Sequence, residues 1–168
     1  MASETTERLL AQLGDSDGKT RQRARDTLTA MGDPALPGLI EQLRSPQSRV
    51  RWEAAKALTE IPDRSAIPGL VSLLADDKSD MRWLAAIGLI NIGYRSIPAV
   101  LQALTEEAGS KGLREASHHV FADLSKRNSV VRGILEPVQA VLGDTDASEV
   151  ISSRAQVALG ELRALGAT

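Results

Sequence analysis

Apolar residues along this chain recur in two helical patterns that alternate with a period of about 31 residues. The first pattern begins near a Pro and places four apolar residues on one helix face, at positions i, i+3, i+4 and i+7. Pro suits the first turn of a helix, where backbone N–H groups have no intrahelical acceptor. The pattern predicts a short amphipathic helix in each of three copies: Leu36, Leu39, Ile40 and Leu43; Ile67, Leu70, Val71 and Leu74; and Ile97, Val100, Leu101 and Leu104.

A second, longer apolar stripe follows each of the first two helices and is rich in small residues. It reads Val50, Ala54, Ala57, Leu58 and Ile61 in one copy, and Met81, Ala85, Gly88, Leu89 and Ile92 in the next. The segments between stripes, such as 44–48 and 75–79, are short and polar and carry turn formers and helix N-cap candidates. Short links between helices of this length predict antiparallel helix hairpins.

Degenerate copies extend the period toward both ends of the chain. Upstream, residues 20–31 match the second stripe, and Leu9, Leu10 and Leu13 match the first without its Pro. Downstream, the register continues over 114–124, the connector lengthens at 126–129 ahead of Leu135–Val138, and a last long helix begins at about Ser148 in the register of the second stripe. We expect one domain over residues 1–168, with the best repeats at about 34–62, 64–93 and 95–126 and degenerate caps at about 4–32 and 130–165. Such a period is typical of solenoids, whose units bury their apolar faces against one another.

These phrases resemble the bacterial type of HEAT-like repeat, which is also seen in phycobilin lyase subunits. The shared features are the Pro-led helix, an Asp-containing turn, the phrase Val-Arg-x-x-Ala-Ala-x-Ala-Leu that begins at Val50, and a closing Gly such as Gly93. The resemblance covers about residues 8–165 and is strongest from 36 to 104. It implies an all-α fold, a right-handed α-solenoid (an α/α superhelix) of about five HEAT-like helix hairpins. It does not imply one activity, because such repeats serve many tasks.

The composition narrows the function classes. The 168 residues are 42% apolar but only 2% aromatic, which suits closely packed helices of Ala, Leu, Ile and Val. The absence of Cys excludes disulfides, thiolate metal sites and cysteine nucleophiles. A formal net charge of −2 provides no positive field for nucleic acid or anionic lipid, so we expect neither as a partner. The cluster of Arg21, Arg23, Arg25 and Arg49 keeps nucleic acid as a minor alternative. No apolar segment resembles a secretion signal or a membrane span, and we expect a cytoplasmic protein.

Two Trp residues take the same position in successive copies of the second helix. Trp52 and Trp83 each lie two residues before the centre of the buried stripe, which turns them about 160° away from it at about 100° per residue. Ile87, Lys56 and His119 fall on the same outward line, one turn later in their own units. In the HEAT-like family the second helix usually lines the concave side of the superhelix, so the resemblance places these residues in a groove.

The sequence therefore predicts a partner-binding groove with aromatic anchors, a feature typical of protein interfaces. Its expected members are Trp52, Trp83 and Ile87 as apolar anchors, Arg23, Lys56 and Glu53 as a polar rim, and His119 beside them. The expected occupant is a helix or an extended peptide of another protein, and a second copy of this chain is an alternative. If the two rings instead fold back onto neighbouring helices, they are peripheral packing and no groove exists.

Four Arg residues also recur at one repeat position: Arg21, Arg51, Arg82 and Arg114. They could form a track for anions or phosphate groups along the groove. We favour a structural ladder, in which each Arg pairs with loop carbonyls and with an inter-helix Asp (Asp15 or Asp17, Asp76 or Asp77), because the Arg at this position commonly does so in HEAT-like repeats.

No arrangement of catalytic or metal-binding residues is visible, and we expect no cofactor, no metal and no enzymatic activity. The adjacent His118 and His119 point about 100° apart, so they cannot chelate one metal from one helix face. Two alternatives come from other HEAT-like proteins. A DNA glycosylase-like protein would set its aromatic residues against damaged DNA, but Lys56 and Ile87 stand where a carboxylate would be needed one turn after each Trp. A tetrapyrrole lyase-like subunit fits the family, although such subunits usually work as pairs and no attachment Cys exists in this chain.

Overall fold

Ten α-helices follow one another along residues 2–166, the part of the chain that this computed structural model describes. They are α1 (Ala2–Gln12), α2 (Gly18–Met31), α3 (Leu36–Gln42), α4 (Ser48–Glu60), α5 (Ile67–Leu73), α6 (Ser79–Ile92), α7 (Ile97–Glu107), α8 (Lys111–Ser125), α9 (Ser129–Gln139) and α10 (Ser148–Ala164). Short 3₁₀ turns, η1 (Asp33–Ala35), η2 (Arg64–Ala66) and η3 (Tyr94–Ser96), precede α3, α5 and α7. Within the described residues no single helix is long and apolar enough to cross a membrane, and the one consecutive pair that is, α6 with the η3–α7 segment, is bent by 119°.

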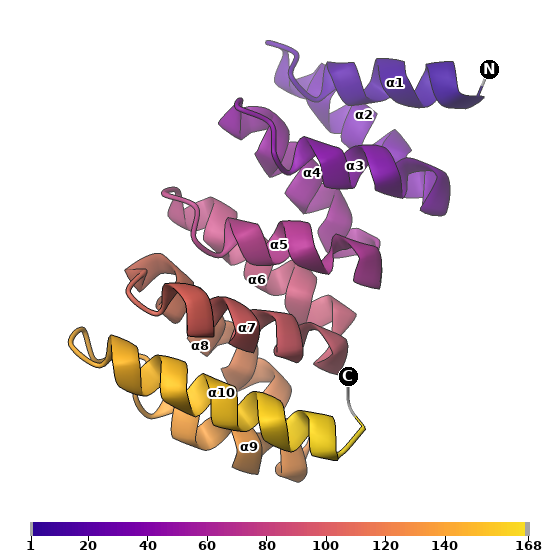
Figure 1. Cartoon of the computed structure of the whole chain (residues 1–168). Coiled ribbons are helices and arrows are strands. Elements are labelled where there is room, and N and C mark those ends of the chain that lie inside the picture. Colours follow the sequence, from indigo (N-terminus) through magenta and orange to yellow (C-terminus); the bar gives the residue numbers. More distant parts are fainter. Residues whose placement is uncertain (1, 167–168) are drawn as a thin grey trace.

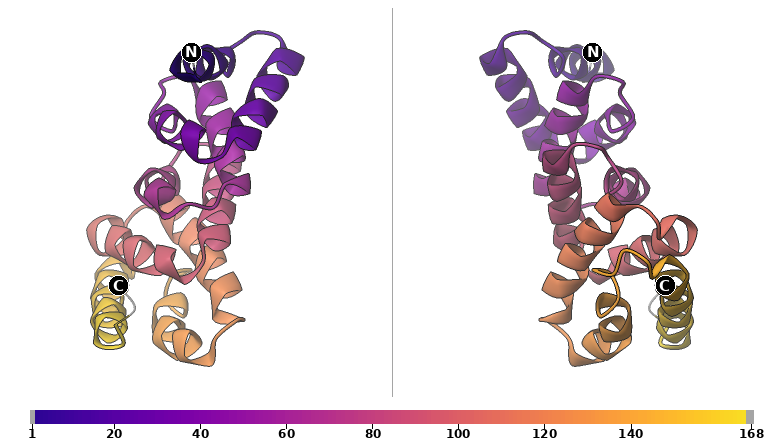
Figure 2. Two further views of the ribbon diagram at one scale, coloured as in Figure 1. Left: turned by 90° about the vertical axis from the view of Figure 1, so that its right-hand side faces the viewer. Right: turned by 90° about the vertical axis from the view of Figure 1, so that its left-hand side faces the viewer.

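The helices lie in two layers that run the length of the molecule (Figure 1). The first layer contains α1, α3, α5, α7 and α10, and the second contains α2, α4, α6, α8 and α9 (Figure 2). Neighbouring helices within a layer come from successive hairpins, so each unit covers the apolar face of the next. The predicted all-α solenoid of five helix hairpins is confirmed.

The last hairpin is reversed relative to the other four. The sequence predicted a second-stripe helix beginning at about Ser148, but α10 packs beside α7 in the first layer, and α9 packs beside α8 in the second. The segment before Pro137 is also helical, so this Pro lies near the end of α9 and does not begin a helix. The C-terminal unit therefore presents its two helices in the opposite order.

The connector after α8 explains the reversal. After α2 and α6, the chain turns back to the first layer through Gly32 (φ 63°) and Gly93 (φ 87°), each followed by a 3₁₀ turn. After α8 there is neither a positive-φ Gly nor a 3₁₀ turn, and Asn128 caps α9 directly by accepting hydrogen bonds from the N–H groups of Val130 and Val131. The chain continues in the second layer and returns to the first only through the longer 140–147 segment.

The core lies between the two layers and is built from the predicted stripes. Leu39, Leu58, Leu70 and Leu89 are fully buried. The Gly of the Pro-Gly-Leu phrase has a packing role, because a Cβ at Gly69 would lie 2.6 Å from Cδ1 of Leu43 in the preceding first-layer helix. A Cβ at Gly38 would likewise collide with the side chain of Leu10 in α1. These two glycines therefore let successive first-layer helices approach closely.

Two Asp side chains cap the start of helical segments, and the capping hydrogen bonds lower the pKa of each carboxyl group. Asp17 caps α2, and hydrogen bonds from the Thr20 hydroxyl and from the backbone N–H groups of Thr20 and Lys19 lower its pKa from the ordinary value of 3.8. Asp63 caps η2, and hydrogen bonds from the hydroxyl and backbone N–H of Ser65 lower its pKa similarly. Both caps favour the ionised carboxylate.

Candidate functional site

The two Trp residues occupy equivalent places on α4 and α6 but differ in exposure. Trp83 is 56% exposed, whereas Trp52 is half-buried and packs against the core. The difference comes from the preceding unit: Arg25 of α2 places its guanidinium carbon 6.0 Å from the centroid of the Trp52 ring. The equivalent residue before Trp83 is Ala55, which cannot reach over the ring. The outward direction predicted for both rings therefore describes Trp83 better than Trp52.

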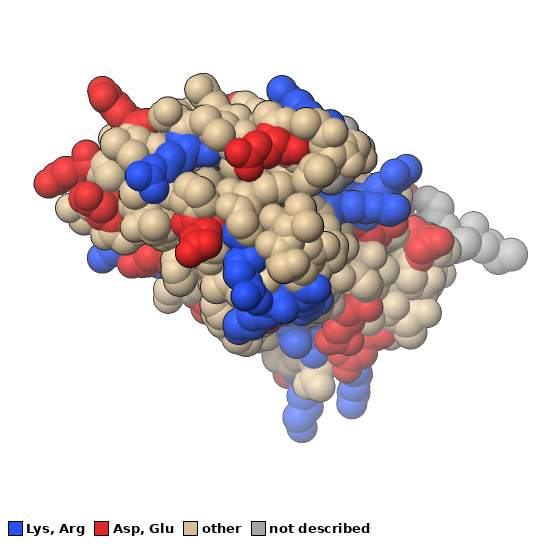
Figure 3. Space-filling view, turned by 90° about the horizontal axis from the view of Figure 1, so that it is seen from below, with Lys and Arg blue, Asp and Glu red and all other residues tan. Residues whose placement is uncertain are grey.

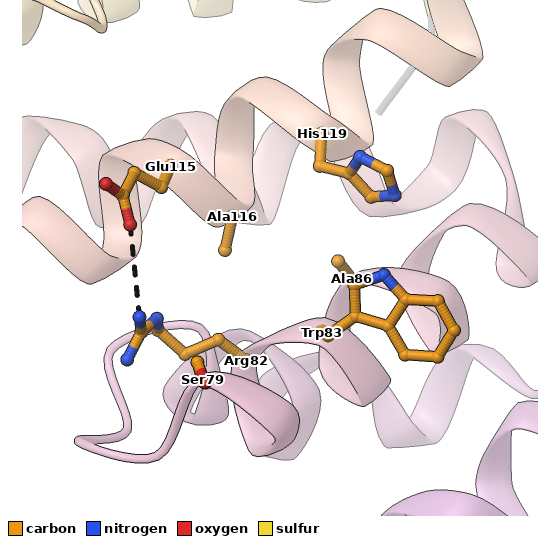
Figure 4. Close-up of a pocket in the computed structure, with 7 residues that line it drawn as sticks. All are labelled: Ser79, Arg82, Trp83, Ala86, Glu115, Ala116 and His119. Carbon is orange, nitrogen blue, oxygen red and sulfur yellow. Dashed lines mark ion pairs between the residues drawn. The ribbon is translucent and has the colours of Figure 1, made fainter.

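Trp83 forms one wall of a pocket between α6 and α8 (Figure 4). This Trp83 pocket is lined by Ser79, Arg82, Trp83 and Ala86 of α6 and by Glu115, Ala116 and His119 of α8. Ala116 lies between its two ends, with Trp83, Ala86 and His119 toward one end and Arg82 and Glu115 toward the other. The pocket thus joins an aromatic wall and an apolar floor to a charged edge.

The charged edge lies against Gly112 at the start of α8, where an added side chain would crowd Arg82. A nitrogen of the Arg82 guanidinium lies 3.9 Å from a carboxylate oxygen of Glu115. The side chain of Arg82 runs across the start of α8, where a Cβ at Gly112 would lie 2.8 Å from its Cδ. Arg82 also donates hydrogen bonds to the backbone carbonyls of Asp76 (2.9 Å) and Asp77 (3.2 Å). Its place at the pocket is therefore fixed from three sides.

A second, more polar hollow lies one unit earlier along the second layer. It is lined by Arg21, Ser48, Arg49, Trp52, Glu53, Lys78, Asp80 and Met81. Ser48 and Trp52 in this hollow correspond by repeat position to Ser79 and Trp83 in the Trp83 pocket. The two hollows share α6, so they follow one another along the same layer.

Of the other residues predicted for the groove, the structure brings some to this surface and removes one from it. His119 lines the Trp83 pocket, Ile87 is half-buried one turn after Trp83, and Arg23 is exposed on α2. Nζ of Lys56 lies 3.8 Å from a carboxylate oxygen of Glu60 on the same helix. The sequence placed Glu53 on the polar rim, but the structure buries it.

Glu53 is only 5% exposed and lies between two Arg side chains of α2. Its carboxylate accepts hydrogen bonds from Nε of Arg21 (3.2 Å) and from Nη1 of Arg25 (2.8 Å). A buried carboxylate requires such partners, because an unpaired buried charge is costly. Glu53 therefore joins α2 to α4 and is not available to a partner. The sequence places Arg25 in a cationic cluster but does not reveal its contact with Glu53, because that contact depends on how α2 docks on α4.

Three of the four Arg residues at the repeated position make the same two kinds of contact. They donate to a carbonyl six residues earlier, in the loop before their own helix: Arg21 to Asp15, Arg51 to Ser45, and Arg82 to Asp76. The same three approach a carboxylate of the next unit, namely Glu53, Asp76 and Glu115. For Arg21 the predicted Asp carboxylate is replaced by the Asp15 carbonyl and the Glu53 carboxylate.

Arg114 departs from this arrangement. It is 4% exposed and donates to the carbonyls of Asp144 (3.1 Å) and Thr145 (3.4 Å) in the loop that follows α9. Within the described residues it has no carboxylate partner at ion-pair distance, and its Nε has no hydrogen-bond acceptor. The described residues also contain no cluster of three or more His, Asp or Glu that could hold a metal ion.

Comparisons with known proteins agree with this architecture. The sequence model of HEAT repeats matches residues 6–90 and 36–122. A chain from the structure of the complex of CpcE and CpcF of phycocyanin lyase from Nostoc sp. PCC7120 is similar over 93% of this chain and 98% of its own length, with 20% sequence identity and a TM-score of 0.63. That similarity shows a shared fold, and no curated protein sequence gives a significant match. Because the HEAT matches together span more than half of its residues, the chain belongs to the HEAT-repeat family.

Proposed function

We propose that this protein is a non-enzymatic interaction scaffold that holds a segment of another protein against its second layer, with Trp83 as the central anchor. The observation that supports this most is the 56% exposure of the Trp83 side chain beside a floor formed by Ala86 and Ala116. Covering a large exposed aromatic side chain with a partner removes apolar surface from water and so lowers the free energy of the complex. Trp is also enriched among the residues that dominate binding energy.

The dimensions of the Trp83 pocket favour a side chain as its occupant. Its volume is about 260 Å³, below the range of roughly 300–1,000 Å³ that is typical of small-molecule sites. An apolar side chain of a partner can lie on Ala86 and Ala116 and contact the face of Trp83. The ion pair of Arg82 and Glu115 and the imidazole of His119 then provide hydrogen-bonding groups at the two ends.

The second hollow extends this surface to more than one contact point. A helix or an extended segment lying along the layer can place one residue in the Trp83 pocket and another near Trp52. Arg23 and Lys56 are then the polar rim, without Glu53. The similar structure supports a protein partner, because it is the structure of a complex of two proteins, CpcE and CpcF.

A quantitative affinity purification tests the proposal. The wild-type chain, Trp83→Ala, Ile87→Ala and the control Leu165→Ala are compared as baits, since Leu165 is 59% exposed but lies after α10. Trp83→Ala is expected to recover at least about tenfold less of its specific partner than the wild type, as for a central interface residue. Leu165→Ala should recover as much as the wild type. If Trp83→Ala and Ile87→Ala retain every partner of the wild type, the scaffold does not bind through this surface.

A lyase-like subunit that handles a tetrapyrrole is the second candidate, supported by the shared fold with the phycocyanin lyase complex. Visible absorbance of the purified chain after incubation with a free bilin separates the two. A red-shifted, stoichiometric complex that Trp83→Ala abolishes would favour the lyase-like role. Fluorescence of the Trp residues during titration with a DNA oligonucleotide gives the third outcome: a change that weakens with salt would identify a nucleic-acid-binding protein.

A further inference from the structure

Helix α10 has two opposite faces without charge, and only one of them is covered. Its buried face consists of Ile151, Ala155, Ala158, Leu159 and Leu162, which pack on α7 and α9. Roughly 180° around the helix, at about 100° per residue, lie Val150, Ser153, Val157, Gly160 and Ala164. All five are exposed to solvent, with Val150 at 45% and Val157 at 60%. We call these five residues the α10 outer face.

An uncharged outer face is unexpected at the end of a solenoid. Terminal repeats normally present a polar face to water, because no further unit covers them. The first helix follows that rule: Glu4 and Arg8 lie on the side of α1 opposite Leu9 and Leu13. Helix α10 does not, so its outer face is an unpartnered helix surface with valines spaced two turns apart.

The charges beside this face identify the occupant that it suits. Glu149 and Arg163 lie along one edge of the α10 outer face, near its two ends. Arg154 and Glu161 lie along the other edge, about one turn on either side of Val157. Each edge therefore carries one acidic and one basic residue, and the order of signs is opposite on the two edges. Figure 3 shows this end of the molecule, where a band of uncharged surface has charges of both signs on either side.

This arrangement is complementary to itself under a two-fold rotation. When two copies of α10 pack antiparallel with their Val157 residues near the axis, each edge of one helix meets the same edge of the other in reverse order. Glu149 then faces Arg163 of the second copy, and Arg154 faces Glu161, so that symmetry generates four oppositely charged pairs. Gly160 and Ala164 let the helices approach closely, and the two Val157 side chains meet at the centre.

We propose that the α10 outer face is a homodimer interface in which two copies of this chain pack antiparallel through α10. Arg154 donates one hydrogen bond to the carbonyl of Pro137 (2.7 Å), which holds its side chain along α9 and leaves its other N–H groups for the second copy. The interface is isologous, so it closes at two copies and does not propagate into filaments. It is separate from the Trp83 pocket, so its test is independent of the proposed function.

The first experiment measures molar mass against concentration by analytical ultracentrifugation. The wild-type chain is expected to pass from monomer to dimer, and Val157→Glu to raise the dissociation constant at least about tenfold, because two carboxylates would meet at the axis. Arg44→Glu, which is exposed and distant from α10, is the matched control and should dimerise like the wild type. A wild-type chain that stays monomeric up to about 1 mM, or a dimer that Val157→Glu leaves intact, would overturn the proposal.

The second experiment uses the sign of the edge charges. Arg154→Glu and Glu161→Arg each place like charges opposite one another in their own homodimers, so each alone should dimerise more weakly than the wild type. A one-to-one mixture of the two variants restores opposite charges at both contacts and should form a heterodimer. A different partner on this face, or head-to-tail stacking, predicts no such rescue. Absence of rescue in two variants that keep wild-type circular dichroism would contradict the antiparallel pairing.

Discussion

Arg25 lies over Trp52, with its guanidinium carbon 6.0 Å from the centroid of the indole ring. The next unit has Ala55 in the corresponding place, which leaves Trp83 uncovered. One repeated residue is therefore part of the packing in one unit and part of the accessible surface in the next.

The two Trp residues should accordingly differ in their contribution to stability. Trp52→Ala is expected to lower the free energy of unfolding by about 2 kcal/mol, because it removes a half-buried ring and its contact with Arg25. Trp83→Ala should change it by less than about 0.5 kcal/mol, as for other exposed side chains. Urea unfolding followed by circular dichroism measures both. Equal losses in the two variants would contradict the difference in burial.

Substitution of the buried Glu53 should also lower the free energy of unfolding. Glu53→Gln removes the charge that faces Arg21 and Arg25, whose side chains are 20% and 14% exposed. Allowing for this partial solvent screening, we expect a loss of about 1–3 kcal/mol in the free energy of unfolding. Glu115→Gln is the matched control: its side chain is 56% exposed, and its ion pair should contribute less than about 0.5 kcal/mol.

Within the Arg ladder, Arg51 and Arg114 should respond differently to the same substitution. Arg51→Met leaves Asp76, whose side chain is 7% exposed, without its cationic partner, and should cost about 1–3 kcal/mol. Arg114→Met strands no carboxylate and removes a buried charge that has no ion pair among the described residues. Thermal unfolding of the two variants should rank Arg51→Met as the less stable. The reverse order would show that the loop carbonyls of Asp144 and Thr145 dominate.

Two glycines in helices should give opposite responses to an added side chain. Gly69→Val forces a branched side chain against Leu43 and should lower the free energy of unfolding by about 1–3 kcal/mol. Gly133→Ala in α9 meets no neighbouring atom within 4 Å, and it should raise the free energy of unfolding by about 0.5–1 kcal/mol through helix propensity. Both are measured by denaturant unfolding at low protein concentration. A stabilising Gly69→Val would mean that successive first-layer helices are not in close contact.

The helix cap at Asp17 predicts a pH dependence. Because hydrogen bonds lower its pKa in the folded chain below the ordinary 3.8, its contribution to stability is complete well above that value. The contribution is lost as the pH falls through the folded-state pKa, where the carboxylate takes up its proton. Asp17→Asn keeps a capping oxygen without a titrating group, so its stability should fall less steeply on acidification. Thermal melts between pH 7 and acidic pH compare the slopes, and identical slopes would show that the cap does not titrate with unfolding.

The sequence predicted those features that depend on neighbours in the chain. The stripes through Leu39 and Leu58 identified the helices and their buried faces, because helical periodicity is a local property. The burial of Glu53 depends on Arg21 and Arg25 of another helix, so no spacing around Glu53 reveals it. The layer taken by α10 depends on the missing 3₁₀ turn after α8, which the apolar register of Ala155 and Leu162 does not encode. Local pattern thus specifies each helix, and the docking of helices decides which charges remain accessible.

The reversed last hairpin also determines where the chain can be labelled or tethered. Both α1 and α10 stand in the first layer, so the described chain enters and leaves the array on the side opposite α4 and α6 (Figure 1). Five hairpins of uniform order would have ended in the second layer. A pair of fluorophores on α1 and α10 would therefore report changes in the distance between the two ends of the superhelix. Neither label would lie on the layer that carries Trp83.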